Sequence, residues 1–274
     1  MLAIGILAGF VGSLLGIGGG MIITPIITTF FGVDIKYAIG ASIVAVIATS
    51  SGAAISYLKD DMINIRAAMF LEIFTTIGGL VGAILAGLFN ATILNLLFGA
   101  LLVYQTWNMW NKLHQGEKVL KQAKPDELAE KLSLNSSYYD KQLKQEVEYQ
   151  VEKIPQGASI MFGAGFASGL LGIGSGAFKV LAMDSMMKMP LKASTATSNL
   201  MIGVTAAASA TVYFFNGYVN PAIAAPVALG IVGGAAIGSK VMPHLPARTI
   251  RMIFIPIVAI MAIDMILKGI GVIH

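Results

Sequence analysis

The sequence contains no cysteine and few charged residues. Without cysteine among its 274 residues, disulfide bridges, thiolate chemistry and cysteine-ligated metals are excluded. Charged residues make up 12% of the chain and hydrophobic residues 56%, whereas an average soluble domain carries about a quarter charged residues. With a mean hydropathy of +0.79, the chain is too apolar for an ordinary cytosolic enzyme. These absences predict a multi-pass protein of the lipid bilayer.

Histidine is also scarce, and this bears on catalysis within the membrane. An intramembrane hydrolase needs an embedded Ser–His pair or two buried aspartates. The three histidines lie in the charged segment, a loop and the C-terminus, at His114, His244 and His274, and the aspartates Asp184 and Asp264 lack matching flanks. The glycine motifs lack the βαβ surroundings of a dinucleotide site, and no GxxxxGK[ST] sequence is present to bind ATP. The sequence therefore predicts no catalytic residue, no metal site and no cofactor.

Charge is concentrated in one segment of the chain. Residues 111–155 hold 8 lysines and 8 acidic residues, which is half of all charges in a stretch with no net charge. The net charge of +4 therefore lies in short loops between apolar runs, as it does in membrane proteins with positive-inside loops. This distribution favours contact with anionic lipid over nucleic-acid binding. We interpret residues 111–155 as a solvated, partly helical cytoplasmic linker, a tether more than a partner-binding segment.

Apolar runs divide the rest of the chain into membrane spans. A helix needs about 20 residues to cross the bilayer core. The runs are 2–33, 37–58, 67–111 with a break near Asn90, 154–178, 193–239 with a break near 216–221, and 252–267. The alternating strands of a membrane barrel are absent. The sequence thus predicts an all-α polytopic protein of the plasma membrane.

The chain contains an internal repeat with a constant offset of 156 residues. The motif LLGIGGG at Leu14–Gly20 matches LLGIGSG at Leu170–Gly176. The same offset pairs Lys36 with Lys192, Ser42 with Ser198, Thr49 with Thr205, Tyr57 with Tyr213, Asn64 with Asn220, Gly78 with Gly234 and Gly82 with Gly238. Because about 80 residues align without an insertion, chance is excluded. The predicted organisation is repeat 1 over residues 1–110, the linker over 111–155 and repeat 2 over 156–274.

The charged loops predict that the two repeats have opposite orientations. Loop 59–66 is charged, whereas its counterpart 215–222 is not; conversely, the uncharged turn near Asn90 corresponds to the basic loop 243–251. Opposite charge bias at equivalent loops indicates inverted-topology repeats. We expect each repeat to be a Gly-tipped helical hairpin or broken helix followed by three transmembrane helices. Two short helices that fully span would preserve the same topology.

The two glycine tips are the predicted substrate site. Short, Gly-interrupted segments at matching places in two repeats point to the central site of a transporter. Glycine lets the backbone turn and expose N–H groups, and the half-helix that follows presents its positive N-terminal end to an anion. The repetition favours this interpretation over helix packing, the usual role of membrane glycines. The candidate binding residues are Gly18, Gly19, Gly20, Thr24, Ser42, Gly174, Ser175, Gly176, Lys179, Ser198 and Asn199.

Lys179 is a lysine within a predicted span, which costs about 2.5–3.5 kcal/mol on insertion scales. Its equivalent in repeat 1 is the apolar Ile23. We interpret Lys179 as the counter-charge of an anionic substrate; snorkelling and pairing with Asp184 are the alternatives. A Lys179→Ala variant is then expected to bind the anion more weakly and to stay folded. The other acids within spans, Glu72 and Asp264, are expected to be solvated or to cap helix ends rather than to relay protons.

The repeated motif is similar to that of a known family. Gly-Phe-x-x-x-Leu-Leu-Gly-Ile-Gly-Gly-Gly over Gly9–Gly20, followed by Pro25, Ala41-Ser42 and a Ser/Thr-rich helix that ends in Ser56-Tyr57, resembles the sulfite exporter TauE/SafE family. The resemblance covers both repeats. It implies a permease for sulfite, organosulfonates or related sulfur anions that works without a bound ATPase subunit. It also implies that the family motif falls on Gly18, Gly19 and Gly20 in repeat 1 and on Gly174 and Gly176 in repeat 2.

Repeat 2 departs from the family pattern. Ser175 replaces the middle glycine, and Leu181 occupies the position equivalent to Pro25. The charged linker is also longer than the usual connection in the family. Since the altered repeat carries Lys179, these departures affect the choice of substrate more than the transporter class.

Together, these features predict a secondary transporter, an exporter or permease of small sulfur-containing anions such as sulfite or organosulfonates. It would work by alternating access around a midplane site. A passive anion channel is the alternative, because the same dipoles and hydroxyls can line a pore. The expected partners are a sulfur oxyanion or sulfonate, the lipid bilayer and a coupling proton or ion, with a homodimer expected on general grounds and no nucleic acid.

Overall fold

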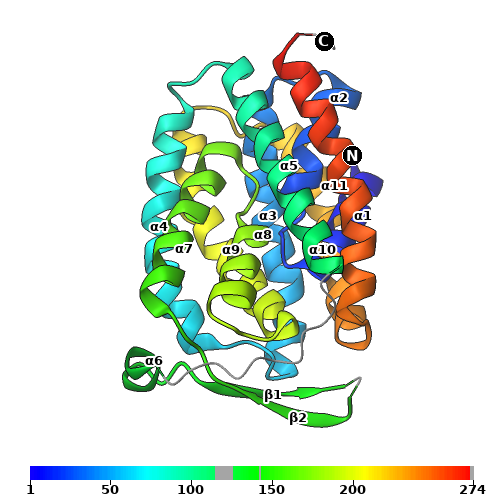
Figure 1. The fold of residues 1–274 in the computed structure, drawn as a ribbon. Helices are drawn as coiled ribbons and strands as arrows, with labels where there is room; N and C mark the ends of the chain where they lie inside the picture. Colours follow the sequence, from blue (N-terminus) through cyan, green and yellow to red (C-terminus); the bar gives the residue numbers. More distant parts are fainter. Residues whose placement is uncertain (115–125, 142, 272–274) are drawn as a thin grey trace.

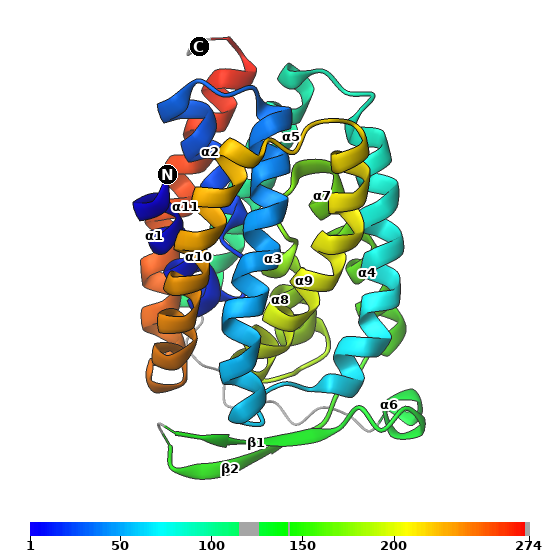
Figure 2. The same ribbon diagram turned by 180° about the vertical axis from the view of Figure 1, so that it is seen from behind.

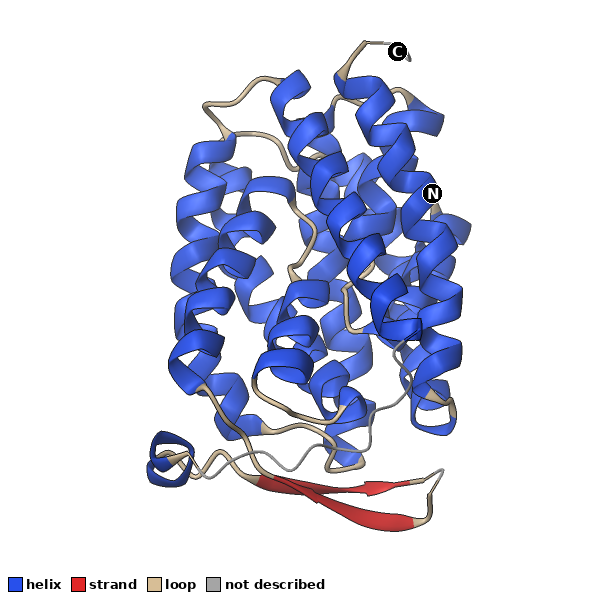
Figure 3. Ribbon diagram, in the orientation of Figure 1, coloured by secondary structure: helices blue, strands red, loops and turns tan. Residues whose placement is uncertain are grey.

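The computed structural model describes residues 1–114, 126–141 and 143–271, which form a bundle of helices with a two-stranded ribbon at one end (Figures 1 and 3). The helices of repeat 1 are α1 (Leu2–Leu15), α2 (Gly20–Phe31), α3 (Ile35–Lys59), α4 (Ile65–Ala86) and α5 (Ala91–His114). Between the repeats lie α6 (Glu127–Lys131), β1 (Ser136–Asp140) and β2 (Gln145–Tyr149). The second repeat comprises α7 (Ile154–Leu171), α8 (Gly176–Leu181), a π-helical turn (Ala182–Met186), α9 (Leu191–Phe215), α10 (Pro221–Val241), a 3-10 turn (Met242–His244) and α11 (Ala247–Gly269).

The bundle has the length and the outer surface of a membrane protein. Four described helical segments are long and apolar enough to cross a membrane: α3, α4, α9 and Pro221–His244. Large apolar side chains face outward, among them Leu229 of α10 at 70% and Phe215 of α9 at 82% exposure. Apolar side chains on the outside of such helices are solvated by lipid. The protein is therefore a multi-pass membrane protein.

The helix boundaries follow from the sequence. Asp34 accepts a hydrogen bond from the N–H of Lys36 at the start of α3. Asn64 and Asn220 likewise cap α4 and α10 through their side-chain oxygens. Such caps satisfy N–H groups that have no partner within the helix. The predicted breaks near Asn90 and at 216–221 are confirmed, because α5 begins at Ala91 and α10 at Pro221.

The internal repeat recurs in the structure helix by helix. The starts of α2, α3, α4 and α5 lie at residues 20, 35, 65 and 91, and those of α8, α9, α10 and α11 at 176, 191, 221 and 247. Each start in repeat 2 is thus 156 residues after its counterpart. Packing is exchanged between the repeats, since α1 packs against α10 and the equivalent α7 packs against α4. The core is therefore shared by both halves of the chain.

Glycines make this exchanged packing close. A Cβ added to Gly165 of α7 would lie 2.0 Å from the carbonyl oxygen of Thr75 on α4. At the equivalent place, a Cβ on Gly9 of α1 would lie 2.4 Å from the carbonyl oxygen of Ile231 on α10. Neither contact leaves room for a side chain, which is how small residues let membrane helices approach. The glycine-rich composition is thus used in the same way on both sides of the molecule.

Helices α3 and α9, which start 156 residues apart, run in opposite directions along the bundle. At one end, Asp60 after α3 contacts Lys141 at 2.6 Å, and Lys192 at the start of α9 contacts Asp140 at 2.8 Å. At the other end, Tyr37 near the start of α3 packs edge-to-face on Tyr218 after α9. The end of α3 and the start of α9 therefore share the ribbon end of the molecule, which Figures 1 and 2 show from two sides.

The linker differs from the expectation of a partly helical tether. It contains the five-residue helix α6, but Ser136–Asp140 and Gln145–Tyr149 pair as an antiparallel β-ribbon, so the all-α expectation is wrong for these two strands. Alternation in β1 explains the ribbon, because Tyr138 and Asp140 are buried while Tyr139 between them is exposed. The side-chain amide of Asn64 donates to the carbonyl of Leu134 at 2.7 Å. The linker is therefore packed onto the ends of the helices.

Candidate functional site

The two glycine tips meet inside the bundle. The chain runs along α1, turns and comes back along α2, and α7 and α8 form the equivalent hairpin from the opposite end (Figures 1 and 2). A Cβ on Gly176 would lie 2.0 Å from the carbonyl oxygen of Gly16, and one on Gly20 would lie 2.8 Å from that of Gly172. The structure thus brings together the tip residues that the sequence analysis selected from both repeats.

Both tips require left-handed backbone. In repeat 1, Gly18 and Gly19 have φ of +81° and +67°, which glycine adopts without steric cost. In repeat 2, Gly174 has φ of +76°, and Ser175 holds φ of +50° although it is not a glycine. Ser175 is fully buried, and its hydroxyl has no hydrogen-bond partner within the described part of the chain. The departure from the family motif therefore places a strained residue with a free hydroxyl at the tip.

Ser42 and Ser198 hold the tips in place. The hydroxyl of Ser42 on α3 lies 2.7 Å from the carbonyl oxygen of Gly172 and 3.0 Å from that of Gly20. Ser198 on α9 makes the equivalent contacts, at 2.8 Å to Gly16 and 3.2 Å to Gly176. Each serine has one proton to donate, and backbone carbonyls take it. These two candidates therefore position the tips.

Thr24 and Asn199 retain unused hydrogen-bonding capacity. Both side chains are fully buried. The hydroxyl of Thr24 has no partner among the described residues, and neither has the side-chain oxygen of Asn199. The amide nitrogen of Asn199 donates to the carbonyls of Ser13 and Thr195, each at 3.0 Å. Since buried polar groups are normally paired, the open atoms at Thr24, Ser175 and Asn199 are exceptions among the described residues.

Lys179 is paired with an acid that the sequence analysis did not connect to it. Its side chain is fully buried, and its Nζ lies 3.1 Å from Oε2 of Glu72 on α4 and 2.6 Å from the hydroxyl of Thr205 on α9. The hydroxyl of Thr205 in turn donates to the other carboxylate oxygen of Glu72. We call these three residues the buried triad.

The triad corrects two expectations. Glu72 is 8% exposed and ion-paired, so the prediction that it is solvated or caps a helix is wrong. Full burial of Lys179 likewise excludes snorkelling to an interface. The pairing was not detectable along the chain, because Glu72 and Lys179 are 107 residues apart. The available signal was one acid and one lysine, each alone in an apolar span.

The triad is not repeated at the symmetry-related positions on the other side of the molecule. The positions equivalent to Lys179 and Glu72 are Ile23 and Ala228. The equivalent of Thr205 is Thr49, whose hydroxyl lies 2.9 Å from the carbonyl oxygen of Gly18 and so bonds to the tip itself. Backbone symmetry is therefore kept, while the charged chemistry is confined to the side formed by α4, α8 and α9.

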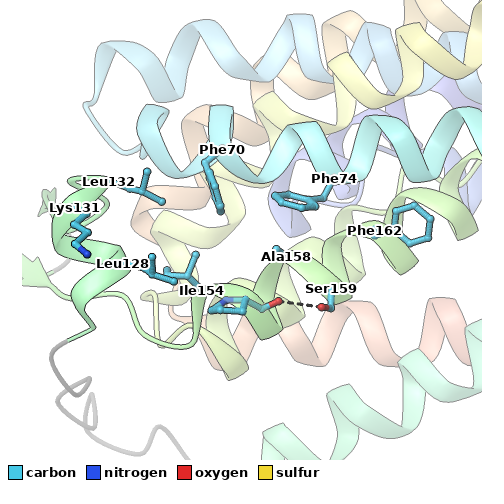
Figure 4. Close-up of a pocket in the computed structure, with 10 residues that line it drawn as sticks. Phe70, Phe74, Leu128, Lys131, Leu132, Ile154, Ala158, Ser159 and Phe162 are labelled. Atoms are coloured by element: carbon cyan, nitrogen blue, oxygen red, sulfur yellow. Dashed lines mark hydrogen bonds between the residues drawn. The ribbon is translucent and has the colours of Figure 1, made fainter.

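A separate pocket of about 810 Å³ lies near the ribbon end, between α4, α6 and α7 (Figure 4). Its walls are mainly aromatic and aliphatic, with Phe70 and Phe74 from α4, Phe162 from α7 and Lys131 from α6. None of its lining residues belongs to the predicted site. An apolar cavity does not compensate the charge of a small oxyanion, so the candidate site is the pair of tips with the buried triad.

Comparisons with known proteins agree with a membrane transporter. The sequence model of the sulfite exporter TauE/SafE family matches residues 1–265. The chain is 27% identical over 277 residues to Probable membrane transporter protein YunE of Bacillus subtilis, covering 98% of this chain and 97% of that protein. It is 27% identical over 284 residues to a probable membrane transporter protein of Methanocaldococcus jannaschii, covering 97% and 94%. No solved structure matches the chain significantly.

Proposed function

Because the chain belongs to the sulfite exporter TauE/SafE family, we propose that it is a secondary transporter of small sulfur-containing anions such as sulfite or organosulfonates. Its relatives are named as probable membrane transporters, which fits a carrier and not an enzyme. The observation that carries the proposal is the meeting of the two glycine tips around open polar atoms in the bundle interior.

The polar atoms at the tips suit an oxyanion. The hydroxyls of Thr24 and Ser175 each have a proton to donate, and both are buried. Hydrogen bonds to a charged acceptor are stronger than those between neutral groups, contributing about 1.5–3 kcal/mol each. Lys179 lies one helical turn beyond Ser175, where its backbone N–H bonds to the Ser175 carbonyl at 2.9 Å, and it adds a positive charge to this part of the chain. Sulfite and sulfonate groups offer three oxygens to such donors.

In alternating access, the two repeats would be the parts that move against each other. The opposite directions of α3 and α9 support inverted topology across the membrane, with the tips near the midplane and the linker in the cytoplasm. In the proposed cycle, one repeat rocks against the other about the tips. Close contact between Gly176 and the Gly16 carbonyl leaves no open pore there, and this favours a carrier over a channel. A homodimer stays a prediction that light scattering on the purified protein measures.

The first test is a panel of anions on the purified protein, scored by thermal stabilisation and by uptake into liposomes. Sulfite, thiosulfate, methanesulfonate, sulfoacetate, taurine, sulfate and chloride cover the relevant charges and shapes. We expect one sulfur anion to stabilise the protein and to enter liposomes with saturable kinetics. Chloride flux that does not saturate would indicate a channel, and no response to any anion would overturn the proposal.

Two variants test the tip itself. Ser175→Gly removes the hydroxyl and restores a residue that accepts the left-handed backbone, and Thr24→Val removes a hydroxyl at nearly constant volume. Each should weaken anion affinity about tenfold or more, because a hydrogen bond to a charged group is lost. Thr211→Val is the matched control, since Thr211 is exposed on α9 and bonds to Ala207 within its own helix. Equal affinity in all three variants would remove the tip from the binding site.

A further inference from the structure

The buried triad of Glu72, Lys179 and Thr205 joins two charged groups in the interior of the bundle. We propose that Glu72 takes up one proton each time Lys179 binds an anion, so that the protein is a proton–anion symporter. This inference rests on the proposed function, since it assigns a second ligand to the same site.

Charge balance within the bundle is the first argument. Glu72 and Lys179 together carry no net charge, and both are buried. Unpaired charges within the bilayer are costly, so a site of this kind stays close to neutral. When an anion contacts Lys179, the site acquires a charge of −1. Protonation of Glu72 restores neutrality with groups that are already present.

The contacts in the triad allow the ammonium of Lys179 to exchange one partner for another. The ammonium of Lys179 contacts both Glu72 and Thr205, and Thr205 also donates to Glu72. A proton on the carboxyl of Glu72 removes the attraction that holds the ammonium. Lys179 then turns toward the tip, where the hydroxyl of Ser175 lies one helical turn away with no partner among the described residues. The proton comes from water and stays on the carboxyl oxygen, and no covalent bond to carbon or sulfur changes.

Asymmetry between the repeats argues against a purely structural pair. The exchanged packing is duplicated on the other side of the molecule, where Ile23 and Ala228 occupy the equivalent positions. The fold therefore forms this interface without any charge. Since buried ion pairs often add no net stability relative to apolar residues, the pair is retained for a reason other than packing.

The other titratable groups on the surrounding helices contact other partners or lie elsewhere. Helix α7 contains no Asp, Glu, Lys, Arg, His or Tyr. On α4 and α9, Arg66 and Lys192 contact the linker, and Tyr213 donates to backbone carbonyls of α7. Asp184 lies on the π-helical turn after α8, and Tyr104 of α5 stacks on an α8 phenylalanine. Glu72 is the carboxylate in contact with the Lys179 ammonium.

The test is uptake of methanesulfonate into liposomes under an imposed pH gradient, because this monovalent anion does not change charge near neutral pH. With one proton carried per monovalent anion, a gradient of one pH unit, acid outside, should accumulate the anion about tenfold. Glu72→Gln mimics the protonated state, so it should bind and exchange the anion but should not accumulate it. Asp264→Asn is the matched control, a neutralised carboxylate on α11 that Thr29 contacts away from the triad. It should accumulate the anion as the wild type does.

A double variant removes both charges together, so that neither is left buried without its partner. Glu72→Ala combined with Lys179→Ile installs the residues of the opposite side, Ala228 and Ile23. It should fold with unchanged or higher thermal stability and lose anion accumulation. Full pH-driven accumulation by this variant would overturn the coupling proposal.

The two proposals fail in distinguishable ways. Saturable uptake by the wild type that ignores pH gradients of either sign, with Glu72→Gln behaving identically, would overturn proton coupling and leave the transporter standing. No uptake of any anion by the wild type would overturn both.

Discussion

One turn beyond the glycine tip, repeat 1 has Ile23, whereas repeat 2 has Lys179 at the equivalent position. The serine that holds each tip, the exchanged helix packing and the glycine contacts are the same on both sides. The charged triad is not. The comparison separates scaffold from chemistry: what both sides share brings the tips together, whereas the triad, which Glu72 of repeat 1 forms with Lys179 and Thr205 of repeat 2, has no counterpart on the other side.

The largest effect is expected from a substitution where the two tips contact each other. Gly176→Ala places a Cβ 2.0 Å from the Gly16 carbonyl oxygen, a backbone atom that has no freedom to move aside. Overpacking usually costs about 1–3 kcal/mol and more where backbone must shift, so we expect little folded protein. Gly20→Ala meets the Ser42 hydroxyl at 2.6 Å and the Gly172 carbonyl oxygen at 2.8 Å, so its overlap with backbone is smaller and it should be the milder variant. Chromatographic monodispersity and thermal unfolding compare the two, and a reversed order would contradict the tip geometry.

Removing one charge tests the asymmetric side. Lys179→Ala leaves Glu72 buried without its counter-ion, which costs about 3–5 kcal/mol. The sequence alone led to the expectation that this variant stays folded, and the buried pair adds a loss of stability to that expectation. Thermal unfolding should show a clear loss of stability, and the added Glu72→Ala substitution should recover most of it. A stable single variant would mean that Glu72 takes up a proton or reaches water or another cation.

The two tip serines should behave alike. Ser42→Ala and Ser198→Ala each remove hydrogen bonds to two buried carbonyls. Leaving buried acceptors unsatisfied costs about 1–3 kcal/mol, and symmetry predicts similar losses in the two variants. Thermal unfolding of both variants measures the difference. A much larger effect at Ser198 would show that the symmetry of the tips is only geometric.

The test of membrane topology should have the smallest effect on the protein. Labels require exposed positions, and Lys59 and Asn216 are exposed near the ends of α3 and α9. Met62, in the loop after α3, is only 2% exposed and is therefore unsuitable. Single cysteines there should leave stability unchanged, and the absence of native cysteine keeps the background clean. Inverted repeats predict labelling from opposite sides of the membrane. Labelling from one side would contradict the inverted arrangement.

Much of the architecture was predictable from the chain. The offset of 156 residues, the helix breaks and the two glycine tips follow from local patterns, because glycine, apolar run length and caps act over a few residues. The ribbon at 136–149 was missed, since its alternation is short and lies within a charged segment. Among the site candidates, Ser42 and Ser198 were selected for hydroxyls that in fact bond to the tips.

The sequence by itself determined that this chain is a duplicated, apolar helical protein with a charged linker and two glycine-rich turns. Only the tertiary structure decided which side chains meet across the bundle. Glu72 and Lys179 lie on helices of different repeats, 107 residues apart, and no period along the chain relates them. Their pairing depends on α7 packing against α4, so that α8 lies within reach of the carboxylate. Contacts of that kind arise from close packing of whole helices, which local sequence patterns do not specify.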